Sequence, residues 1–103
     1  MSLSKSCIVN ISGSHQNIEI RTYINKRIRP LFNRVPTHSS FQFSISEVNN
    51  LLEGQLVIRS SCIFFMSTQR ADNIYGVIES IVEDILLQID LWINKKIKTN
   101  MEK

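Results

Sequence analysis

The sequence predicts an α+β fold in which two helices pack on one face of a four-stranded sheet, in the order β-α-β-β-β-α. Two segments repeat apolar residues at three- and four-residue steps, and four shorter segments alternate in polarity or form short apolar runs. Three of the expected strands follow each other closely, so antiparallel hairpins are their simplest pairing. Stacking both helices on one sheet face is the simplest layered arrangement, and it leaves the other face open.

The first half of the chain predicts one strand and one helix. An apolar run at Cys7–Ile11 ends in a turn cluster at 12–14, which is typical of a short strand. A helix follows, and Pro30 should kink it or end it near Arg29, because proline lacks a backbone donor. The inner stripe of this helix comprises Ile20, Ile24, Ile28 and Leu31.

The middle of the chain predicts three strands. Apolar and polar residues alternate over 41–46, which is the pattern of a half-buried strand. A turn between Asn49 and Gly54 leads to a strand at Gln55–Arg59, and Cys62–Met66 forms another that is apolar on both faces. We also expect Cys7 and Cys62 to be buried reduced thiols, because both lie in apolar stretches.

A long second helix is predicted to begin after Asp72 or Asn73 and to be centred on Ile78. Its core-facing stripe comprises Ile74, Ile78, Ile81, Val82, Ile85, Ile89 and Trp92. Across the chain, the residues predicted to be buried are Ile11, Ile24, Ile28, Leu31, Phe43, Ile78, Ile81, Ile85 and Ile89.

Length and composition predict one ordinary globular domain over residues 1–103. The chain is 43% hydrophobic and 20% charged, and it has no apolar run approaching the roughly 20 residues that cross a bilayer. No secretory signal is apparent at the start, so we expect a cytoplasmic protein without a membrane partner.

Basic charge is concentrated at two places. Residues 1–34 carry six cations and one acid (+5), residues 35–94 carry two cations and seven acids (−5), and residues 95–103 carry four cations and one acid (+3). Such asymmetry favours a polyanionic partner, whereas a merely solvated face is the plain alternative. Lysines 95, 96 and 98 also suit the C-terminal end of a helix, where cations stabilise the helix dipole.

No arrangement of residues points to catalysis, a cofactor or a metal. His15 and His38 lie in predicted loops, away from any metal-ligand spacing with the cysteines. Glu83 and Asp84 are adjacent acids on a helix surface, where solvation is the usual state of a carboxylate. We therefore expect a protein that is not an enzyme and has no small-molecule substrate.

Several landmarks along the chain resemble the short form of the ribosome hibernation-promoting factor family, also called ribosome-associated inhibitor A or the sigma-54 modulation protein/S30EA family. Val9–Gly13 is similar to the family's first strand with its I-[ST]-G turn. Ile20–Leu31 is similar to its first helix, and Asp72–Glu79 to the start of its second. Gln88 matches a glutamine that the family often has midway along helix 2. The resemblance covers nearly the whole chain.

The resemblance implies a factor that binds the small ribosomal subunit in stationary phase or under stress. Members of the family occupy the channel used by mRNA and tRNA, and so block translation without catalysing a reaction. The long-form members have a C-terminal dimerisation domain, which we do not expect here. Contacts to rRNA phosphates are assigned to Arg21, Lys26, Arg27, Arg29, Arg34, Lys95, Lys96 and Lys98.

Helix 2 departs from the family pattern. Members usually have several basic residues on the outer face of this helix, where this chain has Asp84, Leu87, Leu91 and Ile93. Two exposed leucines one turn apart are either scattered surface residues or a protein contact. The alternative function is therefore a small non-catalytic interaction module, or a homodimer formed through Leu87 and Leu91. A double-stranded-RNA-binding domain is less well supported, because that fold usually has three strands.

Overall fold

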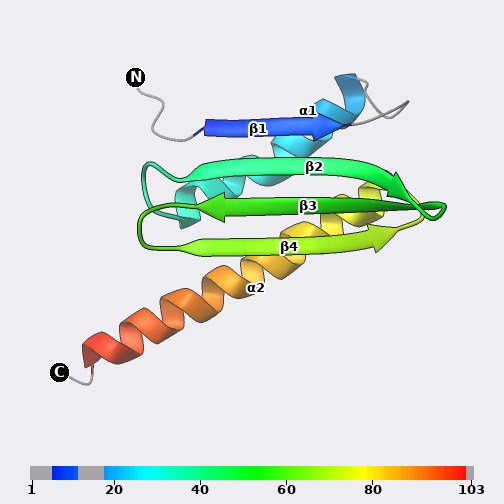
Figure 1. Cartoon of the computed structure of the whole chain (residues 1–103). Coiled ribbons are helices and arrows are strands. Elements are labelled where there is room, and N and C mark those ends of the chain that lie inside the picture. Colours follow the sequence, from blue (N-terminus) through cyan, green and yellow to red (C-terminus); the bar gives the residue numbers. More distant parts are fainter. Residues whose placement is uncertain (1–5, 12–17, 102–103) are drawn as a thin grey trace.

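The computed structural model describes residues 6–11 and 18–101, with side-chain surroundings for 8–11 and 18–95. Its elements are β1 (Ser6–Ile11), α1 (Ile18–Ile28), the 3-10 helix η2 (Arg29–Arg34), β2 (Ser40–Val48), β3 (Leu51–Arg59), β4 (Phe64–Ala71) and α2 (Ile74–Met101). The strands lie in the order β1-β2-β3-β4 (Figure 1). β1 is parallel to β2, and the other neighbours are antiparallel. The predicted α+β fold and its element order are confirmed.

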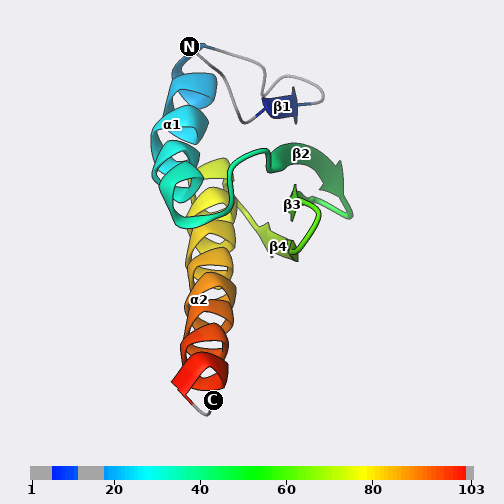
Figure 2. The same ribbon diagram turned by 90° about the vertical axis from the view of Figure 1, so that its left-hand side faces the viewer.

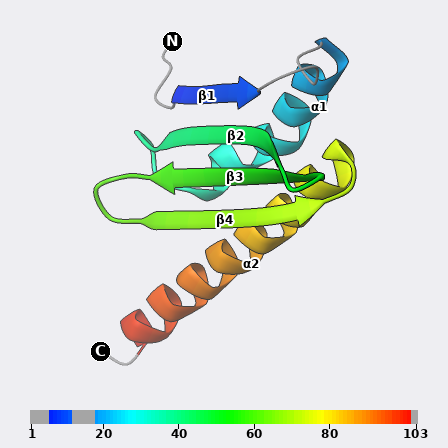
Figure 3. The same cartoon turned by 45° about the vertical axis from the view of Figure 1, so that its right-hand side comes forward.

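Both helices cover the same face of the sheet. Figure 2 shows α1 and α2 side by side on one side of the strands, running in the same direction. α2 crosses behind β3 and β4 on a diagonal, and its C-terminal half extends past the edge of the sheet (Figure 3). The far face of the sheet has no covering element within the described residues. A surface of exposed and half-buried side chains therefore remains on that side, as predicted.

The core lies between this sheet face and the two helices. Alternate residues of β2 and β3 point inward, while α1 and α2 contribute residues at helical spacing. The nine apolar residues predicted to form the core are each at most 4% exposed: Ile11, Ile24, Ile28, Leu31, Phe43, Ile78, Ile81, Ile85 and Ile89. The hydrophobic periodicity therefore predicted the buried faces correctly.

Pro30 ends α1 as expected. The α-helix stops at Ile28, and the chain continues as η2 over Arg29–Arg34, with Pro30 in its first turn. The structure also shows which of the two predicted residues, Asp72 or Asn73, caps the start of α2. The Asn73 side-chain oxygen accepts a hydrogen bond from the backbone N–H of Gly76 at 2.7 Å, so Asn73 is the N-cap.

The turn between β2 and β3 is shorter than predicted. It contains only Asn49 and Asn50, whose φ angles of 52° and 67° match the left-handed conformation of a two-residue hairpin. β3 therefore begins at Leu51, and Gly54 lies within the strand instead of the turn. A Cβ atom on Gly54 would lie 2.4 Å from Cγ1 of Val77, so the missing side chain lets α2 pack directly on β3.

The prediction for the last strand was wrong in its bounds. β4 begins at Phe64 and continues through polar residues to Ala71, where the apolar run suggested Cys62–Met66. Its inward positions include Ser67, a buried hydroxyl that donates to Asp84 Oδ2 at 2.6 Å. Because α2 supplies this acceptor, a polar residue fits the inner face, and strand length does not follow the apolar run.

The prediction of two buried thiols was wrong for Cys62. This residue is exposed in the connection between β3 and β4, where its backbone N–H donates to the Ser60 hydroxyl at 3.2 Å. The side chain of Cys7 lies outside the described residues, as do the predicted turn at 12–14 and His15.

Candidate nucleic-acid interface

The basic residues of α1 and η2 divide into two groups according to what surrounds them. Arg27 and Arg34 face α2 and form ion pairs with its carboxylates. Arg21, Lys26 and Arg29 are exposed and form no ion pair with any residue in the described part of the chain. Helical geometry explains the division, because residues one or two positions apart point about 100° or 200° away from each other.

Arg27 belongs to a polar cluster between the two helices. Its Nε and Nη2 donate to the two carboxylate oxygens of Glu79, each at 2.7 Å. The Tyr23 hydroxyl also donates to Glu79, and the Tyr23 ring packs edge-on against Tyr75 at 4.9 Å between centroids. Tyr23 and Arg27 are four residues apart and therefore reach the same side of α1.

Hydrogen bonding in this cluster shifts the pKa values of its members. The bonds from Arg27 and then Tyr23 lower the pKa of Glu79, because they favour its ionised form. The same bond to Glu79 raises the pKa of Tyr23, since the hydroxyl must stay protonated to donate. Arg27 and Glu79 side chains are each 38% exposed, so the cluster is both a link between the helices and partly accessible to solvent.

Arg34 makes a second link to the same helix. Its Nη2 lies 2.5 Å from Oδ1 of Asp90, and the two side chains are 40% and 56% exposed. The ion pairs of Arg27 and Arg34 therefore tie α1 and η2 to α2 at two points along their length. These two arginines were predicted to contact RNA phosphates, and each already has a carboxylate partner.

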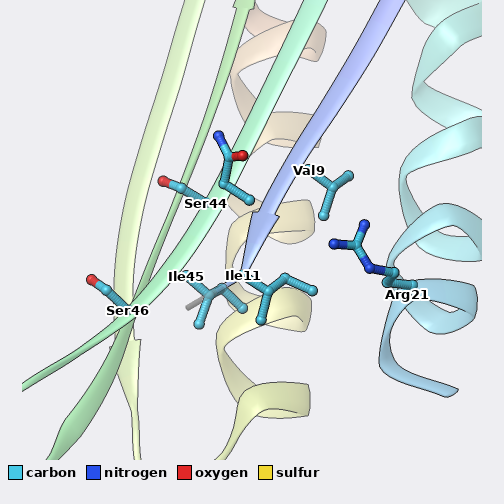
Figure 4. Close-up of a pocket in the computed structure, with 7 residues that line it drawn as sticks. Val9, Ile11, Arg21, Ser44, Ile45 and Ser46 are labelled. Atoms are coloured by element: carbon cyan, nitrogen blue, oxygen red, sulfur yellow. The ribbon is translucent and has the colours of Figure 1, made fainter. Parts of the chain in front are cut away.

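Arg21 lies on the opposite side of α1, next to the ends of β1 and β2. It borders a pocket of about 350 Å³ together with Val9, Ile11 and Ser44. Figure 4 shows the guanidinium extending from α1 toward β1. Arg21 is exposed, and among residues 6–11 and 18–101 no carboxylate pairs with it, so an external anion can reach it.

Lys26 and Arg29 border a larger, shallow hollow of about 660 Å³ where α1 passes into η2. Pro30, Phe32 and Asn33 form the rest of its lining. Sequence reasoning singled out the two cations but did not find this hollow, because Phe32 in its lining is positioned by the distant ring of Phe41 on β2. In the sequence, the i, i+3 spacing of Lys26 and Arg29 indicates that these two cations lie on the same side of the helix.

The predicted lysines at the C-terminal end lie on α2, which extends to Met101. Lys95 is exposed. The side chains of Lys96 and Lys98 lie outside the described residues.

The outer face of α2 differs from the prediction at two positions, Asp84 and Ile93. Ile93 is half-buried and packs against the core. Leu87 and Leu91 are 58% and 60% exposed, as expected for residues opposite the core stripe. Asp84 was expected beside them but is half-buried and turned toward β4, where it accepts hydrogen bonds from Ser67 and Gln69. One turn further, Gln88 Nε2 donates to the Met66 carbonyl oxygen at 2.9 Å, which partly covers the edge of β4.

Within residues 6–11 and 18–101, the structure contains no cluster of three or more side chains suited to hold a metal ion. None of the described helices is long and apolar enough to cross a membrane. The accessible features are thus charged and apolar surfaces, together with shallow hollows.

The fold and this surface define a small α+β domain with two parallel helices on one sheet face and a basic first helix. Comparison with protein-family models and with curated proteins finds no match. Among solved structures, the N-terminal domain of Protein Y from Thermus thermophilus is similar, with a TM-score of 0.71 and 13% identity, over 89% of this chain and 99% of that one. A ribosomal subunit interface protein from Coxiella burnetii is similar with a TM-score of 0.72 and 8% identity, over 84% of this chain and 96% of that one. These similarities establish the fold, which is the one that the resemblance to the hibernation-promoting factor family implied.

Proposed function

We propose that this protein is a ribosome hibernation factor that binds rRNA of the small subunit. The observation that carries the proposal is a set of exposed cations on α1 and η2 that form no ion pair with any residue the structure describes: Arg21, Lys26 and Arg29. Two acidic residues of α2 that face α1 and η2, Glu79 and Asp90, are already bound to Arg27 and Arg34. A phosphate approaching Lys26 and Arg29 therefore meets positive charge. The fold shared with a ribosomal subunit interface protein supports the same partner.

The proposed mechanism is electrostatic and steric. Lysine and arginine side chains pair with phosphates and release counterions, without reading the base sequence. Bound in the channel for mRNA and tRNA, the domain blocks translation by occupancy in the cytoplasm of stressed or stationary-phase cells. Lys95, Lys96 and Lys98 contribute further contacts from the end of α2. Arg27 and Arg34 are half-exposed, so each can share its guanidinium between the carboxylate and a phosphate.

Sedimentation of the purified protein with ribosomes and separated subunits tests the proposal. We expect it to pellet with the small subunit and to dissociate as salt rises. The double variant Lys26→Ala/Arg29→Ala should weaken binding by roughly tenfold or more, and should lower the log–log salt slope by about 0.7–0.9 for each lost contact. Failure of the parent protein to follow the small subunit would refute the proposal.

A matched control lies on the far face of the sheet. The Cζ atom of Arg59 lies 5.5 Å from the ring centroid of Phe64, and Nε of Arg70 lies 3.6 Å from Oε1 of Glu53. The variant Arg59→Ala/Arg70→Ala removes the same two charges and, like Lys26→Ala/Arg29→Ala, lowers the net charge from +3 to +1. We expect it to bind ribosomes like the parent. Equal losses in both double variants would mean that net charge matters and that the surface of α1 does not.

The second candidate function is self-association through α2, and the exposure of Leu87 and Leu91 favours it. Replacing both leucines by lysine should abolish a dimer formed at this face, as measured by sedimentation equilibrium. If ribosomal phosphate lies opposite instead, the same variant should pellet more strongly with ribosomes, because it gains two charge contacts. No change in either assay would leave the leucines as ordinary exposed residues.

A further inference from the structure

From the hollow at the junction of α1 and η2 we infer a site for one unpaired nucleotide of single-stranded RNA, with its base against Phe32 and its phosphates on Lys26 and Arg29. The inference deepens the proposed function, on which it rests, by naming a base-stacking residue and a pocket in addition to general phosphate contact. The hollow has a volume of about 660 Å³ and is lined by Lys26, Arg29, Pro30, Phe32 and Asn33.

The backbone explains why these residues meet. Lys26, Arg29, Pro30 and Asn33 are spaced i, i+3, i+4 and i+7, which places them along one side of a helical segment. At Pro30 the segment tightens into a 3-10 helix, in which residues three apart lie almost in line. Arg29 and Phe32 have that spacing, so the cation and the ring become neighbours.

The ring of Phe32 packs against the core on one side. It meets the buried ring of Phe41 at 4.6 Å between centroids and an interplanar angle of 61°. The side chain is half-buried, so part of the ring stays accessible in the hollow. An aromatic ring fixed by the core on one side and open on the other is suited to base stacking, because every base has a π-face.

The polar groups around the ring suit the rest of a nucleotide. Lys26 and Arg29 are exposed, and no ion pair with a residue in the described ranges neutralises them. The exposed side-chain amide of Asn33 has both a donor and an acceptor for a base edge. An acidic peptide could satisfy the two cations but makes no use of an accessible ring, which is why we assign the site to RNA.

Binding of a labelled oligouridylate, followed by fluorescence anisotropy, tests the inference against two probes of similar charge: an abasic analogue of the same length and a glutamate peptide. We expect the base-bearing RNA to bind the parent protein clearly more tightly than either. Phe32→Leu, which retains an apolar side chain but removes the ring, should weaken oligouridylate binding by roughly fivefold or more. The same variant should bind the abasic analogue like the parent.

Two further measurements keep the test independent of folding. Thermal unfolding of Phe32→Leu shows whether loss of the Phe41 contact alters the protein. In the unaltered parent, the NMR signal of the Asn33 side-chain amide should shift with oligouridylate but not with the abasic analogue.

The two charge variants serve as controls for the phosphate contacts. Arg59→Ala/Arg70→Ala should bind oligouridylate like the parent, whereas Lys26→Ala/Arg29→Ala should lose binding to both RNAs.

The outcomes separate this inference from the proposed function. If the parent pellets with the small subunit but binds both RNAs and the peptide equally, or binds none of them, the nucleotide site is wrong and the ribosomal function stands. If binding depends on the base and on Phe32 but the protein does not follow ribosomes, the site stands and the ribosomal function is wrong.

Discussion

Lys26 and Arg27 are adjacent in the sequence and have the same charge, yet their surroundings differ completely. Lys26 is exposed beside a hollow, whereas Arg27 makes two 2.7 Å hydrogen bonds to Glu79 on α2. The same contrast holds between Arg29 and Arg34 along η2. The basic first helix therefore has one side whose cation binds α2 and another whose cations are exposed and have no carboxylate partner among the described residues. A count of charges along the sequence adds the cations of both sides together. It cannot show which of them pair with carboxylates of the same protein.

The largest effect is expected from a change that disturbs the approach of α2 to the sheet. In Gly54→Ala the new Cβ would lie 2.4 Å from Cγ1 of Val77, two residues from Glu79, so α2 must move. We expect a loss of about 1–3 kcal/mol in the free energy of unfolding, the range typical of overpacking. Urea unfolding measures it, and the link between Arg27 and Glu79 should weaken as well.

Gly76→Ala is the matched control for this substitution. Gly76 lies in the first turn of α2, and its Cβ would lie 3.3 Å from the Cβ of Ala71, a far milder approach. Alanine also favours a helix over glycine. We expect a much smaller change in stability than for Gly54→Ala, and equal losses would contradict the close packing of α2 on β3.

Arg27→Ala and Lys26→Ala test the comparison directly. Removing Arg27 leaves the Tyr23 hydroxyl as the remaining hydrogen-bond partner of the half-buried Glu79 among the described residues of α1. We therefore expect a loss of about 1 kcal/mol in the free energy of unfolding, reduced by the solvent exposure of the pair. Lys26→Ala should change stability by less than about 0.5 kcal/mol. Urea unfolding of both variants, with a double-mutant cycle through Glu79→Ala, measures the coupling. Indistinguishable stabilities would show that the two sides of α1 do not differ.

A pH titration sharpens the role of Glu79. Its pKa is lowered in the folded protein, first by the hydrogen bond from Arg27 and then by that from Tyr23. The stabilisation from this carboxylate is therefore fully present above its ordinary pKa of 4.5 and is lost as the pH falls through the lower folded value. Glu79→Gln should lose less stability on acidification than the parent. Parallel curves of unfolding free energy against pH would contradict this role.

The smallest effect is expected at the second link. Arg34 and Asp90 are 40% and 56% exposed, and ion pairs of that kind contribute little because solvent screens them. Arg34→Ala should lower the unfolding free energy by less than about 0.5 kcal/mol. A larger loss, measured by thermal or urea unfolding, would make Arg34 as important to the fold as Arg27.

The candidate site was predictable only in part. The resemblance and the charge pattern selected all of the cations on α1 and η2, because lysine and arginine are visible in a sequence. Their division into paired and unpaired groups was not predictable, since Arg27 meets Glu79 across 52 positions of the chain. The hollow was missed for a related reason: its wall at Phe32 is positioned by Phe41 on β2.

What the sequence by itself determined is the order of the elements and the buried faces of both helices. Apolar periodicity is a local property, and residues such as Ile24 and Ile85 can reach the core from only one side of a helix. The tertiary structure decided the rest. It extended β4 through Ser67 by supplying Asp84 as a partner, placed Gly54 under Val77, and turned Arg27 toward α2 while leaving Lys26 in solvent. In each case the deciding atom belongs to a segment distant in sequence, so its effect exists only once the chain has folded.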